Sequence, residues 1–84
     1  MPLRFGDHVS TAETDYGTVL LDERAGAYWE LNPTATLVVR TLLNSGEEAD
    51  AAAALVREFR IDEEQALRDV ETLVGQLRSS GLAS

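Results

Sequence analysis

The fold of this chain is decided by fourteen residues, Leu20–Pro33, which read LLDERAGAYWELNP. An apolar run leads into a polar turn that ends at Gly26, a residue type that readily takes a positive φ. After the turn, apolar and polar residues alternate over Ala27–Leu31, as they do in a strand with one buried face. Asn32 can then cap a helix, and Pro33 suits the first helical position because its φ is already fixed. The stretch therefore predicts a strand, a turn, a second strand and the start of a helix.

Two segments upstream of the turn extend this hairpin into a sheet. Tyr16–Asp22 alternates with period two and predicts the strand before the turn, while Val9–Thr14 predicts a shorter first strand. Three short strands are not stable alone, so one face must pack on helices. The residues that we expect to point inward are Val19, Leu21, Trp29 and Leu31. Those that we expect on the outer face are Tyr16, Leu20 and Tyr28.

Downstream of Pro33 the apolar spacing becomes helical. The first helix ends at Gly46, and a second covers Glu48–Phe59 with glutamates near its positive end. The third begins at Asp62, where Gln65 three residues later resembles a capping box, and Gly81 closes it. The apolar faces that we expect to be buried are Leu37, Val38, Thr41, Leu42 and Leu43 in the first helix, Ala52, Leu55, Val56 and Phe59 in the second, and Ala66, Val70, Leu73 and Leu77 in the third.

This order of three strands followed by three helices predicts a fold of the α+β class, with a three-stranded antiparallel sheet. At 84 residues the chain has room for one modest core, so we expect a single domain over residues 1–84. Three helices beside a short sheet also describe a winged helix-turn-helix, a fold often used to bind DNA. That function has to be weighed against the charge of the chain.

The charge of the chain argues against nucleic acid as a partner. Fifteen acidic and seven basic side chains give a net charge of −8, which repels phosphate backbones and anionic lipid surfaces. A helix that reads a DNA groove should be basic, whereas the third helix carries five carboxylates and two guanidinium groups, namely Asp62, Glu63, Glu64, Asp69 and Glu71 against Arg68 and Arg78. The sequence also lacks a membrane-spanning run or a secretory signal, so we expect a cytoplasmic protein that contacts neither nucleic acid nor membrane.

Residues suited to catalysis or metal binding are scarce. The chain has no cysteine and one histidine, His8, which excludes disulfides, cysteine zinc sites and thiol nucleophiles. We find no nucleophile–base pair, phosphate-binding glycine loop or metal-ligand spacing. We therefore expect no enzyme activity, no catalytic residue, no metal and no cofactor.

Two features of the predicted fold could instead bind a partner. In the third helix Leu67 and Val74 lie to one flank of the core stripe, so they form either a wide buried face or a half-exposed apolar wall. If the strands pair in sequence order, Ala27–Leu31 is an edge strand that could accept an added peptide strand. Its shortness and Glu30 could equally serve to shield that edge.

A family resemblance favours the binding interpretation. The segment LLDERAGAYWELN, Gly46 at the end of the first helix, and the pair Asp69–Val70 are similar to the PqqD-like peptide chaperones. The resemblance covers Thr14 to Leu82 and is strongest to the stand-alone leader-recognition proteins of lasso peptide biosynthesis. It implies a RiPP recognition element, which is a truncated winged helix-turn-helix that binds the leader of a ribosomally synthesised precursor peptide.

The resemblance also implies where the leader binds and what happens next. The leader adds as an antiparallel strand to Ala27, Tyr28, Trp29, Glu30 and Leu31, and lies against a helix wall formed by Leu67, Glu71, Val74 and Arg78. Lasso leaders commonly carry a Tyr-x-x-Pro element. A separate cysteine leader peptidase then cleaves the precursor, and a cyclase is a further partner that the resemblance admits.

Two alternative functions stay open at this point. The first is a winged-helix transcriptional regulator, or an acidic regulator that mimics DNA. The second is a PqqD-type peptide chaperone that serves a radical enzyme. This function differs from that of a lasso leader-binding protein only in the partner.

Overall fold

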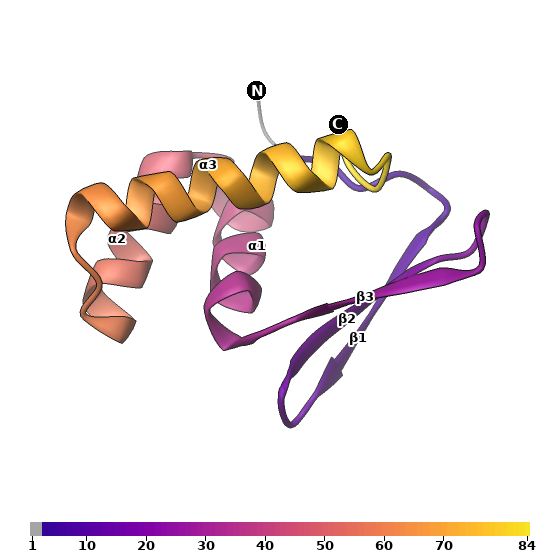
Figure 1. Ribbon diagram of the computed structural model, residues 1–84, viewed down its shortest axis with the longest axis horizontal. Coiled ribbons are helices and arrows are strands. Elements are labelled where there is room, and N and C mark those ends of the chain that lie inside the picture. Colours follow the sequence, from indigo (N-terminus) through magenta and orange to yellow (C-terminus); the bar gives the residue numbers. More distant parts are fainter. Residues whose placement is uncertain (1–2) are drawn as a thin grey trace.

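The computed structural model describes residues 3–84, so Met1 and Pro2 of the predicted domain lie outside the described residues. A three-stranded antiparallel sheet is followed by three helices (Figure 1), which confirms the predicted fold class. The elements are β1 (Val9–Thr14), β2 (Gly17–Asp22), β3 (Ala27–Leu31), α1 (Pro33–Ser45), α2 (Glu48–Phe59) and α3 (Glu63–Ser79). The segments predicted for β1, β3 and α2 agree with the observed strands and helix.

The sheet lies at one end of the molecule and α2 at the other, while α3 runs along the length between them (Figure 1). The strand order β1-β2-β3 leaves β1 and β3 at the edges. Because α1 follows β3 after a single residue, the first helix and the edge strand are fixed relative to each other. Of the helices within residues 3–84, none has the length and hydrophobicity that a membrane crossing requires.

The turn between β2 and β3 sets the register of the hairpin. Asp22 pairs with Ala27, which leaves four residues in the turn. Gly26, at φ 70°, donates its N–H to the Asp22 carbonyl at 2.8 Å. The Asp22 carboxylate also accepts from the two amides that follow Glu23, each at 3.0 Å. This closed turn places Leu20 opposite Trp29.

The register makes part of the predicted inward set wrong. Leu20 is fully buried and Leu21 is 41% exposed, so Leu20 and not Val19 or Leu21 faces the helices from β2. Cross-strand partners share a face, and Leu20 is the partner of Trp29. The predictions for Leu31, which is buried, and for Tyr28 on the outer face are confirmed.

The helix ends follow the predicted signals at α1 more closely than at α3. The Asn32 side chain accepts the Ala35 N–H at 2.9 Å, and Gly46 ends α1 with a φ of 79°. The capping box predicted at α3 is absent, because the Asp62 side chain caps no amide and the Gln65 amide donates to Asp69 at 2.7 Å instead. The Gln65 side chain thus bonds forward along the helix, where a residue four positions on is a near neighbour.

One hydrophobic core joins the sheet to the helices. Its fully or nearly fully buried members include Leu20, Val38, Leu42, Leu55, Ala66, Val70, Leu77 and Leu82. The predicted inward residues Val56, Phe59 and Leu43 are 36%, 41% and 51% exposed, so these predictions are wrong. The buried side of α2 is formed by small residues and one leucine, Ala51, Ala52, Ala54 and Leu55. Alanine side chains let α2 pack closely, which leaves the larger side chains at its margin.

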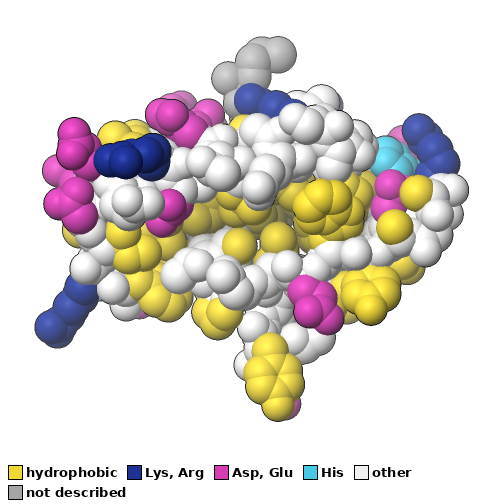
Figure 2. Space-filling model, viewed as in Figure 1, with side chains coloured by type: hydrophobic (Ala, Val, Ile, Leu, Met, Phe, Trp, Pro, Cys, Tyr) yellow, Lys and Arg dark blue, Asp and Glu magenta, His cyan; other side chains and the backbone are white. Residues whose placement is uncertain are grey.

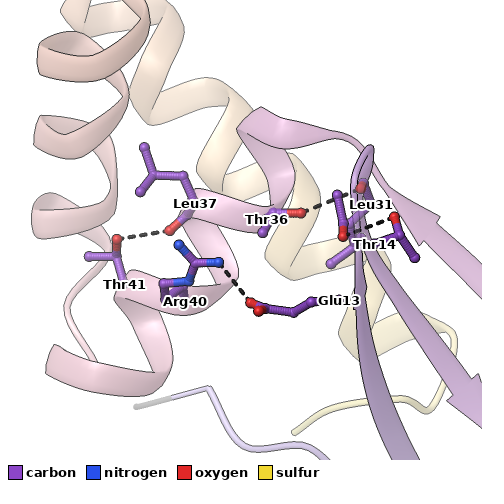
Figure 3. Close-up of polar contacts among 8 residues, drawn as sticks. Glu13, Thr14, Leu31, Thr36, Leu37, Arg40 and Thr41 are labelled. Carbon is purple, nitrogen blue, oxygen red and sulfur yellow. Dashed lines mark hydrogen bonds and ion pairs between the residues drawn. The ribbon is translucent and has the colours of Figure 1, made fainter.

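Polar contacts fasten the sheet to α1 and the two ends of the chain to each other. Arg40 of α1 forms an ion pair with Glu13 of β1 at 2.8 Å, and the Thr36 hydroxyl donates to the Leu31 carbonyl at 3.4 Å (Figure 3). Arg4 and Ser84 exchange two backbone hydrogen bonds. The end of β3 is therefore tied to the first turn of α1, and β1 is tied to the same helix.

Candidate functional site

The free edge of β3 offers backbone groups to an added strand. The Leu31 carbonyl oxygen lies so close to Gly17 of β2 that a Cβ on that glycine would collide with it. The backbone groups of Leu31 therefore point toward β2, and alternation along the strand sends those of Ala27 and Trp29 the same way. The N–H and C=O groups of Tyr28 and Glu30 point to the free edge.

An apolar groove runs beside this edge, between β3 and α3. It consists of two adjoining hollows of about 250 and 570 Å³, and we call it the β3–α3 groove. Its inner hollow is lined by Trp29, Glu30, Leu31, Asn32, Ala35, Leu73, Gln76 and Leu77. Its outer hollow is lined by Trp29, Glu71, Thr72, Gly75, Gln76, Ser79 and Ser80. Figure 2 shows hydrophobic side chains gathered below α3, in the hollow between that helix and the sheet.

The walls of the groove differ in chemistry. Leu31 and Leu77 are buried and form an apolar floor, while Trp29 is 39% exposed and lines both hollows. Gln76 also lines both hollows and brings an amide that can donate and accept hydrogen bonds. A free strand edge beside a groove that has an apolar floor and neutral polar groups at its margin is suited to an extended peptide that inserts alternate side chains.

The structure brings only some of the predicted site residues to this groove. Glu71 lines the outer hollow beside Trp29. Val74 is 4% exposed and belongs to the core, so a half-exposed wall at Val74 is wrong. Leu67 is 40% exposed, but it lines a different hollow between α2 and α3. Arg78 is exposed and is not among the residues that line either hollow.

The wall residues that sequence reasoning missed are Leu73 and Gln76, on the other flank of α3 from Leu67. Leu73 was expected only as part of the core, where it is indeed half-buried. A helical pattern shows that two flanks adjoin the core stripe, yet it does not show which neighbour lies on which flank. The sequence did contain one signal for this wall. The small, uncharged residues Thr72, Gly75 and Ser79 share one side of a helix that is otherwise rich in charged residues.

Groups suited to metal binding do not gather in the described part of the chain. Within residues 3–84, no three His, Asp or Glu side chains lie close enough to hold a metal ion together. The ring of His8 makes a contact of 3.2 Å between Nε2 and the Gly81 carbonyl, in the turn after α3. The β3–α3 groove is therefore the site whose function needs explaining.

Comparison with known proteins points to one family. The family model described as coenzyme PQQ synthesis protein D (PqqD) matches residues 17–83. A solved structure titled lasso peptide synthetase B1 complexed with the leader peptide is 43% identical, covers 100% of this chain and 99% of that chain, and has a TM-score of 0.93. TbiB1 in complex with the TbiA(beta) leader peptide shares the fold at 22% identity, with a TM-score of 0.86 and coverage of 96% and 94%. No curated protein matches the chain.

Proposed function

This chain belongs to the PqqD family, and from that premise we propose that it binds the leader of a ribosomally synthesised lasso precursor peptide. The observation that carries the proposal is the free edge of β3 beside the apolar β3–α3 groove. Support comes from the full-length 43% identity to a lasso peptide synthetase B1 that was solved with a leader peptide. The function is recognition, because the groove offers surface and backbone groups and no reacting group.

In this proposal the leader binds as an antiparallel strand along β3. Main-chain hydrogen bonds to Tyr28 and Glu30 supply affinity, and alternate leader side chains enter the groove between Trp29 and Leu73. A Tyr-x-x-Pro leader brings an aromatic ring for the apolar floor and a hydroxyl within reach of neutral polar groups such as Gln76. Ordering a flexible leader costs conformational entropy, so we expect a dissociation constant between about 10 nM and 10 µM.

The bound leader is then presented to enzymes that act on the rest of the precursor. We assign cleavage to a separate cysteine leader peptidase and ring closure to a cyclase, and this chain catalyses neither step. The division of labour fits a protein without cysteine, whose one histidine contacts the backbone of the turn after α3. We place this adaptor in the cytoplasm with its partner enzymes.

A second candidate function is that of a PqqD-type peptide chaperone for a radical enzyme. The description of the matching family model favours it. Both functions use the same groove and differ in the precursor bound, so the two leaders can be compared directly. The full-length identity to a lasso protein favours the lasso leader, and tighter binding of the precursor peptide of a radical enzyme would favour the second candidate.

Hydrogen exchange tests the strand-addition mechanism. At a leader concentration of 100 times the dissociation constant, we expect the amides of Tyr28 and Glu30 to exchange about 100-fold more slowly, because only the free fraction exchanges. The amides of Ala27, Trp29 and Leu31 should change much less, since they already face β2. Equal protection along the whole strand, or protection confined to α2, would contradict the mechanism even if the leader binds.

A DNA-binding function predicts a different result in a gel-shift titration. With a net charge of −8 and an acidic α3, we expect no duplex binding tighter than about 100 µM in 0.1 M salt, which is weaker than typical non-specific binding. A titration with a random duplex and with the DNA upstream of the gene measures this. A salt-sensitive complex at low micromolar concentration would favour a transcriptional regulator.

A further inference from the structure

A second groove lies on the opposite flank of α3 from the leader site. It is a hollow of about 350 Å³ between α2 and α3, lined by Ala49, Ala52, Ala53, Val56, Arg57, Glu63 and Leu67. We call it the α2–α3 groove. Leu67 and Gln76 are nine residues apart, which is two and a half helical turns, so they point to opposite sides of α3. One helix therefore separates the two grooves, and both can be filled at the same time.

The lining of the α2–α3 groove is apolar and exposed. Val56 is 36% and Leu67 is 40% exposed, and Ala49 and Ala53, which precede Val56 on α2, are exposed as well. Phe59, which is 41% exposed, lies one turn beyond Val56 on α2 and extends the same surface. The core does not need these side chains, because Ala52 and Leu55 already fill the buried side of α2. Exposed apolar side chains that cluster in a hollow are typical of a protein interface.

The margin of this groove is acidic. Residues 47–64, which form α2 and the start of α3, contain seven carboxylates and two arginines. Glu63 and Glu64 lie one helical turn before Leu67. Arg57 has an ion pair with Glu58 at 3.6 Å, so one of the two positive charges already faces a carboxylate. Figure 2 shows acidic side chains gathered at the end of the molecule where α3 begins.

We propose that the α2–α3 groove is the docking surface for the leader peptidase, which would insert an amphipathic segment with apolar side chains between Val56 and Leu67. Lysine or arginine residues of that segment would face Glu63 and Glu64. The acidic margin favours a basic segment over a second copy of this chain, because two copies would bring two acidic margins together. The inference rests on the proposed adaptor function, in which the leader occupies the other groove.

The test separates peptidase docking from leader binding. The probes are the purified leader peptidase of the same biosynthetic system and, separately, the synthetic leader peptide. We expect Val56→Asp to weaken peptidase binding about tenfold or more while the leader affinity stays within twofold, because a carboxylate in an apolar groove is costly to desolvate. Leu43→Asp is the matched control, since Leu43 is 51% exposed on α1 and lines neither groove. Both variants are first compared by circular dichroism and thermal unfolding.

A charge-reversed double variant, Glu63→Arg with Glu64→Arg, keeps the inference falsifiable should Val56→Asp fail to fold. We expect it to weaken peptidase binding about tenfold at 0.05 M salt, with a smaller difference from the unsubstituted chain at 0.5 M salt. Unchanged peptidase binding in both variants, or no peptidase binding by the unsubstituted chain, would overturn the inference. The inference would also be overturned if the unsubstituted chain formed a dimer that Val56→Asp dissociates. Failure of the leader to bind at all would instead overturn the proposed function.

Discussion

Replacement of Trp29 by aspartate is expected to weaken leader binding by about 30- to 100-fold while the domain stays folded. Trp29 lines both hollows of the β3–α3 groove, so the substitution removes a shared apolar wall. It also places a carboxylate where a bound peptide would exclude water, and the two effects together are worth about 2 to 3 kcal/mol. The indole is 39% exposed in the free protein, which limits the cost to folding.

Leu21→Asp is the matched control for this substitution. Leu21 is 41% exposed, close to the exposure of Trp29, but it lies on the outer face of the sheet. We expect its leader affinity, measured by isothermal titration calorimetry, to stay within twofold of the unsubstituted chain. If Leu21→Asp weakens binding as strongly as Trp29→Asp, the leader lies across the outer face and not in the groove.

Gly17→Ala is expected to destabilise the fold by about 3 kcal/mol or more. Gly17 has a φ of 144°, which side-chain-bearing residues rarely adopt, and a Cβ there would collide with the Leu31 carbonyl oxygen. That oxygen belongs to the backbone and also accepts the Thr36 hydroxyl, so it has little freedom to move. Relief of the collision would separate β2 from the end of β3. Urea unfolding followed by circular dichroism measures the loss.

Gly26→Ala serves as the control for the Gly17 substitution. Gly26 also has a positive φ, 70°, but a Cβ at this position meets no atom within 4 Å. The substitution therefore carries the left-handed backbone cost alone, about 1 to 2 kcal/mol. If the two variants lose equal stability, the close approach of Gly17 to Leu31 contributes nothing and the assigned direction of the Leu31 carbonyl is wrong.

Most of the fold could be predicted because its signals are local. Asn32, Pro33 and Gly46 act within one helical turn, so the limits of α1 follow from the sequence alone. The face of β2 could not be predicted in the same way, because Val19, Leu20 and Leu21 make both faces apolar. Only the four-residue turn and the pairing of Leu20 with Trp29 decide which face is buried.

The same distinction between local and long-range signals applies to the candidate site. The edge position of Ala27–Leu31 follows from pairing of the strands in sequence order, which the sheet confirms. The helix wall does not follow, because the rotation of α3 depends on how Val74 packs in the core and on which flank meets the sheet. The helical repeat of the sequence does not determine this rotation. Leu67 was therefore expected at the groove wall that Leu73 and Gln76 form.

The pairing of Arg4 with Ser84 has a consequence for the order of folding. Closing a loop of nearly the whole chain costs about 4 kcal/mol in entropy, by the logarithmic dependence on loop length. The β2–β3 hairpin and the caps of α1 join residues that are close in the sequence, so they form without that cost. We therefore expect the strand edge of β3 to be assembled early and the two ends to meet late. A folding intermediate with frayed ends would already display the edge, and its groove would be completed when α3 docks.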